Sequence, residues 1–225
     1  MGQRVEFPSN AHTCEGYFAA PQTGKGPAVV VIQEWWGLVP HIEDVVNRFS
    51  KEGFAAVAPD LYHGKITQSP DEAEKMKMEL DVERAEREIA GAGDWLLKRT
   101  ECSSKTYGVV GFCLGGGLAQ YAATKEKNVG ATVSFYGRFK KTPLDWTALR
   151  TPILLIYGEN DRGVPAEEGK QLAEQLKKMG KSVEIVVYPG AHHAFFNDAR
   201  KEVYKRDAAA DAWKRTVELF RKNLR

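Results

Sequence analysis

The sequence has few cysteines, no long apolar run and almost no net charge. Its 225 residues include three cysteines, Cys14, Cys102 and Cys113, an odd number without the spacing of a zinc site. We therefore expect neither a disulfide framework nor a metal, and reduced thiols suit a cytoplasmic protein. No apolar run approaches the roughly 20 residues that span a bilayer. With 32 basic and 30 acidic side chains, the net charge of +2 gives no broad electrostatic surface for nucleic acid or an anionic membrane.

Signals for targeting and for a second domain are also missing. Residues 1–7 contain no apolar segment of the kind found in a signal peptide. We see no internal repeat, no low-complexity tract and no linker. At 43% hydrophobic residues, the chain can bury a full core. We therefore predict one domain over residues 1–225.

Short β-branched runs alternate with helical patterns along the chain. We predict an edge strand at 16–20 and buried strands at 28–32, 54–58, up to 112, 131–135, 152–157 and 183–188. Helices are expected at 41–52, 72–80, 81–98, 118–124, 165–179 and 207–224. The charged residues of 72–98 suggest a solvated helix face, and Met76 and Met78 suggest packing. This alternation predicts an α/β protein whose mostly parallel sheet has helices on both faces.

A glycine-rich turn around Cys113 is the most informative stretch. It reads Gly111-Phe112-Cys113-Leu114-Gly115-Gly116, after a predicted strand and before a helix. This is the pattern of a nucleophile elbow, with cysteine where serine usually stands. A helix N-terminus favours the thiolate, and the N–H of Leu114 would face an oxyanion. The pattern also fits an inert buried cysteine in a glycine-rich turn, or a phosphate-binding loop.

Other chemically capable residues follow predicted strands in the same way. They are Glu34, Asp161 and a histidine of the pair His192-His193. Carboxyl ends of parallel strands meet at one edge of the sheet, so these residues can converge with Cys113. The chain order of nucleophile, acid and histidine is that of the α/β-hydrolases. Each residue alone also has a structural explanation, as a turn residue, an exposed loop histidine or a helix-capping carboxylate.

Taken together, these segments resemble the dienelactone hydrolase (carboxymethylenebutenolidase) family. The resemblance runs in order through nearly the whole chain and rests on four motifs: Gln33–Gly37, Gly111–Gly116, Gly158–Asp161 and Pro189–Phe195. It implies an α/β-hydrolase fold and opening of a lactone, or cleavage of an activated ester, through a thioester. It also implies that neither cofactor nor metal is needed. The expected partner is a small-molecule lactone or ester, and the expected state is a monomer or small homo-oligomer.

The resemblance also implies roles for individual residues. Cys113 matches the nucleophile, Asp161 the orienting acid, and His193 the general base, since one residue separates it from Phe195. Glu34 matches a glutamate thought to take the thiol proton. Further matches are Trp35 and Leu114 as oxyanion donors through their N–H groups, and Tyr136 and Trp36 as substrate contacts. A structural role remains open for Glu34, Trp36 and Tyr136.

The chain departs from the family at the groups that hold a substrate carboxylate. Well-known members have an arginine in the middle helical segment, where this chain reads Glu74-Lys75-Met76-Lys77-Met78, and another at the position of Asn197. Lys77 and Arg138 are the cations that could replace them. The natural substrate is therefore open, and a carboxylesterase, a thioesterase or acyl transferase of the same fold, and a redox-sensing thiol protein are the alternatives.

Overall fold

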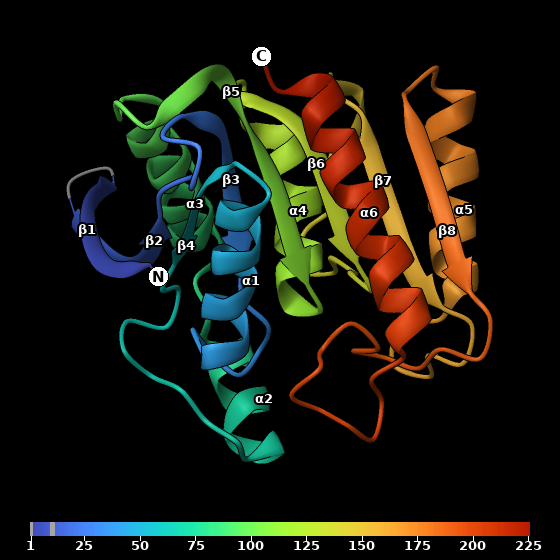
Figure 1. Ribbon diagram of the computed structural model, residues 1–225. Coiled ribbons are helices and arrows are strands. Elements are labelled where there is room, and N and C mark those ends of the chain that lie inside the picture. The colour runs from blue at the N-terminus through green and yellow to red at the C-terminus, as the bar shows by residue number, and fades with distance from the viewer. Residues whose placement is uncertain (1, 10–11) are drawn as a thin grey trace.

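The computed structural model describes residues 2–9 and 12–225. An eight-stranded sheet in the order β1-β2-β4-β3-β5-β6-β7-β8 forms its centre (Figure 1). From β4 to β8 all neighbours are parallel, whereas β1 and β2 pair antiparallel, as do β2 and β4. The strands are β1 (Gln3–Ser9), β2 (His12–Ala19), β3 (Gly26–Ile32), β4 (Ala55–Pro59), β5 (Cys102–Phe112), β6 (Val129–Phe135), β7 (Ile153–Gly158) and β8 (Val183–Tyr188).

Helices cover both faces of this sheet. In Figure 1, α1 (Pro40–Lys51) and α6 (Arg206–Asn223) lie in front of it, and α3 (Val82–Leu97), α4 (Leu114–Lys125) and α5 (Ala166–Lys178) lie behind. Successive residues of β3 point to opposite faces of the sheet and pack in different hydrophobic clusters. Val31 packs in the cluster with α1 and α6, and Val30 packs in the cluster with α3 and α4. This confirms the predicted mostly parallel α/β-hydrolase fold. Within the described residues, no helix is long and apolar enough to cross a membrane.

The remaining elements lie in connections at opposite ends of the parallel strands: α2 lies near their carboxyl ends and η1 near their amino ends. Helix α2 (Pro70–Glu79) follows β4 and extends beyond the sheet (Figure 1). A short 3-10 helix, η1 (Trp146–Ala148), interrupts the predicted loop between β6 and β7. Because ligands of such folds bind at the carboxyl ends of the strands, the connection that contains α2 is a natural wall of an active site.

Three local predictions were wrong. The strand predicted at 16–20 is not an edge strand, because β1 pairs along its outer side. The charged face of α3 is not wholly solvated: Glu88 is only 2% exposed and accepts a hydrogen bond from the Nε of Arg84 at 2.8 Å. Met78 does not pack in the core, since 71% of it is exposed.

Candidate active site

Five neighbouring strands each deliver one residue to the same edge of the sheet. In the spatial order β3-β5-β6-β7-β8, the residues that follow the strands are Glu34, Cys113, Tyr136, Asp161 and His193. Their separation in sequence is therefore no measure of their separation in space. The structure brings the predicted acid, histidine and nucleophile together at the carboxyl end of the sheet.

Cys113 occupies a strained turn between β5 and α4. Its φ of 55° and ψ of −114° lie outside the regions that residues with a Cβ ordinarily adopt. The neighbouring glycines make this turn possible. A Cβ on Gly111 would lie 1.9 Å from the carbonyl oxygen of Gly115, and one on Gly115 would lie 2.5 Å from that of Gln33. The turn therefore packs directly against the end of β3, which carries Glu34.

His193 is held by Asp161. The Nδ1 of its ring lies 2.6 Å from Oδ2 of Asp161, whose side chain is fully buried. The other carboxylate oxygen, Oδ1, accepts hydrogen bonds from the backbone N–H groups of Gly163 and Val164 at 2.9 and 2.8 Å. These bonds fix the carboxylate, which in turn fixes the ring. The neighbouring His192 is exposed.

The surroundings of His193 favour its charged form. Burial of the ring by itself lowers the pKa of His193, but hydrogen bonds to Asp161 and to Cys113, together with their negative charges, raise this pKa to about 10. The ring therefore contacts the acid directly and has Cys113 near enough to influence its pKa. Such an arrangement can exchange a proton with the thiol and stabilise the imidazolium that forms.

Glu34 is buried and receives a hydrogen bond from Asn197. It is only 1% exposed, and its Oε2 accepts from Nδ2 of Asn197 at 2.8 Å. Asn197 is buried as well, and its own Oδ1 accepts from the N–H of Ala199 at 3.1 Å. The amide is therefore oriented toward the glutamate from a loop 163 residues away along the chain. The sequence marked Asn197 only as a departure from a family pattern and gave no sign of this contact.

Tyr136 is a buried neighbour of the catalytic candidates. It is 0% exposed, its ring centroid lies 4.9 Å from that of His193, and its φ is 39°. Within the described residues, its hydroxyl has no hydrogen-bond partner. Burial, and then the negative charges of Glu34, Cys113 and Asp161, raise the pKa of Tyr136 well above its ordinary value. The side chain is therefore a neutral phenol that can offer its proton to an oxygen.

Two backbone N–H groups near the turn of Cys113 are candidate donors to an oxyanion. Leu114 is the first residue of α4, and Trp35 follows Glu34 at the end of β3. As the first residue of α4, Leu114 has an N–H without a partner inside its helix, and among the described turns and loops the N–H of Trp35 makes no backbone hydrogen bond. The indole rings of Trp35 and Trp36 meet edge to face with centroids 4.8 Å apart, and both are partly exposed. Free donors at a helix N-terminus are what a developing oxyanion requires.

Comparison with known proteins identifies the family of the chain. The model of the dienelactone hydrolase family matches residues 14–224. The chain belongs to the dienelactone hydrolase family. It is therefore a carboxylic ester hydrolase.

Relatives and solved structures cover the whole length of this family member. Protein usf of Aquifex pyrophilus is 40% identical over 231 residues, with 100% of both chains covered. A protein of Aquifex aeolicus named "Putative carboxymethylenebutenolidase" is 35% identical, again over 100% of each chain. The crystal structure of a "Putative Dienelactone Hydrolase" from Klebsiella pneumoniae is similar with a TM-score of 0.88, 27% identity and 98% of each chain covered.

The two cations considered for a substrate carboxylate are both paired in this dienelactone hydrolase family member. Lys77 binds both carboxylate oxygens of Glu74, at 3.0 and 2.8 Å. The Nη1 of Arg138 lies 2.9 Å from Oε1 of Glu168. Both pairs are partly exposed. Neither cation is therefore held ready for a substrate anion.

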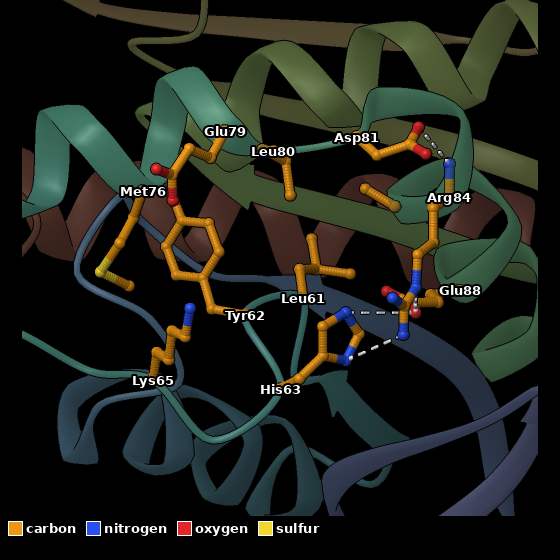
Figure 2. A pocket seen from close by; sticks show the side chains of 11 residues that line it. Leu61, Tyr62, His63, Lys65, Met76, Glu79, Leu80, Asp81, Arg84 and Glu88 are labelled. Atoms are coloured by element: carbon orange, nitrogen blue, oxygen red, sulfur yellow. Dashed lines mark hydrogen bonds and ion pairs between the residues drawn. The ribbon is translucent and has the colours of Figure 1, made fainter.

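A hollow of about 240 Å³ lies between α2, α3 and the segment that follows β4, and the catalytic candidates do not line it. Figure 2 shows Arg84, Glu88 and His63 gathered at one end of it, and Tyr62 and Met76 at the other. Tyr62 lines this hollow, and burial, followed by the charges of Cys113 and Glu74, raises the pKa of its hydroxyl.

Proposed function

We propose that this carboxylic ester hydrolase opens a lactone or cleaves a small activated ester through a thioester on Cys113. The observation that carries the proposal is the 2.6 Å contact between His193 and the buried Asp161, beside the strained cysteine whose charge helps to raise the pKa of His193. The Aquifex aeolicus relative is named for carboxymethylenebutenolidase, a lactone-opening activity. A redox role would need an accessible thiol but not this buried acid.

The first half of the reaction forms the thioester. The sulfur of Cys113 attacks the carbonyl carbon, and the N–H groups of Trp35 and Leu114 hold the resulting oxyanion. The carbon–oxygen bond to the leaving alkoxide then breaks. The imidazolium of His193 gives its proton to that oxygen, while Asp161 keeps the ring in place. In a lactone the alcohol stays attached to the acyl chain.

The second half frees the cysteine. His193, now neutral, takes a proton from water as the water attacks the thioester carbonyl, and the carbon–sulfur bond breaks. The acid is released and the thiolate is restored beside the imidazolium. Glu34 takes the proton of Cys113 if the thiol is protonated when the substrate arrives, since it is a buried carboxylate on the neighbouring strand. Tyr136 and Trp36 contact the substrate.

The experiment that tests the proposal is steady-state hydrolysis of small lactones and aryl esters by the wild-type protein and by Cys113→Ala and Asp161→Asn. Hydrolysis that Cys113→Ala abolishes and Asp161→Asn lowers by about a thousandfold or more supports the assigned roles. Cys113→Ala with wild-type rates would exclude the cysteine as nucleophile.

We further propose that residues 1–225 act as one domain in the cytoplasm, as a monomer or small homo-oligomer. Cys14, Cys102 and Cys113 are all free, which suits a reducing compartment. Light scattering of the purified protein would measure the oligomeric state, and fractionation of cells that express it would test the location.

A further inference from the structure

Helix α2 places an ion pair next to the candidate active site. The Nζ of Lys77 lies 5.8 Å from the centroid of the Trp35 ring. Its partner Glu74 acts electrostatically on Tyr62, and so does Cys113. The pair therefore lies against Trp35, the residue after Glu34, on a helix that extends beyond the sheet at this edge (Figure 1).

Glu74 neutralises the charge that Lys77 would offer to a substrate. The two residues lie three positions apart on α2, and the ammonium binds both carboxylate oxygens. An anion that approaches Lys77 from the side of Trp35 also approaches Glu74. Attraction and repulsion then act over similar distances and largely cancel, while the anion loses hydration against the indole.

Neutral or apolar side chains lie on the Trp35 side of this pair, whereas the ammonium of Lys65 lines the neighbouring hollow with Tyr62 and Met76 (Figure 2). Trp35 and Trp36 present partly exposed indoles. Ile66 is 59% exposed and lies next to the segment of Trp35 and Trp36, since its side chain is close to Gly37. Tyr62 is buried and uncharged at neutral pH. Side chains of this kind bind an apolar substrate well and add little binding energy when the substrate carries a charge.

We propose that the site selects neutral, apolar esters and lactones, and that Glu74 determines this specificity by cancelling the charge of Lys77. This inference rests on the proposed hydrolase function and names its substrate class. It assigns Glu74 no part in the chemistry of the ester bond.

The test compares substrates that differ in charge but hardly in shape. One pair carries the difference in the leaving group: 4-acetoxybenzamide, which is neutral, and 4-acetoxybenzoate, which is anionic. In the second pair the difference in charge lies in the acyl chain. Its neutral member is 4-nitrophenyl pentanoate, and its anionic member is the mono-4-nitrophenyl ester of glutarate. For each pair, the ratio of kcat/KM for the neutral and the anionic member is measured at low and at high salt.

We expect wild type to favour the neutral member of at least one pair by about threefold or more, the scale of one exposed ion pair. Glu74→Gln frees Lys77 and should shift that ratio toward the anion by about threefold to fivefold at low salt, and by less at high salt. Lys77→Gln in the Glu74→Gln background should remove the shift. Glu79→Gln is the matched control: the same helix loses the same charge from an exposed pair with Lys75.

The outcomes separate this inference from the function on which it rests. A wild-type preference for the anionic member of both pairs would overturn the inference and leave the hydrolase function intact. An equal shift in Glu74→Gln and Glu79→Gln would also overturn it, because the effect would then belong to the net charge of α2. No hydrolysis of any ester or lactone would overturn the proposed function, and this inference with it.

Discussion

The backbone at Cys113 allows one prediction that separates strain from chemistry. A residue with a Cβ at φ 55° and ψ −114° carries about 1–3 kcal/mol of strain. Cys113→Ala and Cys113→Gly both remove the thiol, but only the glycine variant removes the Cβ. Glycine adds a backbone entropy cost of about 0.5–1 kcal/mol. We therefore expect the glycine variant to be more stable than the alanine variant by about 1 kcal/mol, which reverses the usual order.

The assay is thermal unfolding of the two variants, followed by circular dichroism. For a chain of this size, about 1 kcal/mol corresponds to roughly 2–4 °C in Tm. Ala210→Gly, on the exposed side of α6, is the control at an ordinary helical position and should lose about 1 kcal/mol. If Cys113→Gly melts below Cys113→Ala by as much as Ala210→Gly melts below wild type, the turn stores no strain and the reasoning fails.

Three further predictions concern the groups around the cysteine. His193→Ala should lower kcat/KM by about a thousandfold, whereas His192→Ala should stay within about twofold because His192 is exposed; the opposite ranking would assign the base to the wrong neighbour. Glu34→Gln should lower turnover by about a hundredfold with an unchanged melting temperature, and normal turnover would reduce Glu34 to a structural role. Since the pKa of His193 is raised from 6.5 to about 10, its charged form adds stability that is complete below about pH 6.5 and is lost as the pH rises toward 10. The Tm of wild type should therefore exceed that of His193→Gln most at pH 6 and least near pH 10, and a gap that widens with pH would contradict the assigned charge.

Much of the fold is local and could therefore be predicted. Buried apolar runs indicated the strands from β3 to β8, and apolar spacing, helix-start residues and a helix-compatible run after the Cys113 turn indicated the helices α1 to α6. Strand β1 was missed because most of its side chains are exposed or half-buried, so it has no apolar pattern. Its pairing with β2 is also what turned a predicted edge strand into an inner one.

The site was predictable only where a local pattern marks it. The glycines around Cys113 indicate a tight turn, because neighbouring backbone atoms leave no room for a Cβ at these positions. The contact of Asn197 with Glu34 has no such mark, since nothing in the local sequence of either residue points to the other. The burial of Glu88 was hidden in the same way by the charged residues around it on α3. Pairings between distant segments depend on the assembled sheet.

The most direct test of the account is intact-protein mass spectrometry after rapid mixing with the lactone and ester panel. The account predicts a transient mass increase equal to the acyl group on wild type, together with product, and neither on Cys113→Ala. For a lactone the increase equals the whole molecule, because the alcohol remains attached. Product formed by Cys113→Ala at the wild-type rate, or an acyl group carried on another residue, would contradict the central claim that Cys113 is the nucleophile.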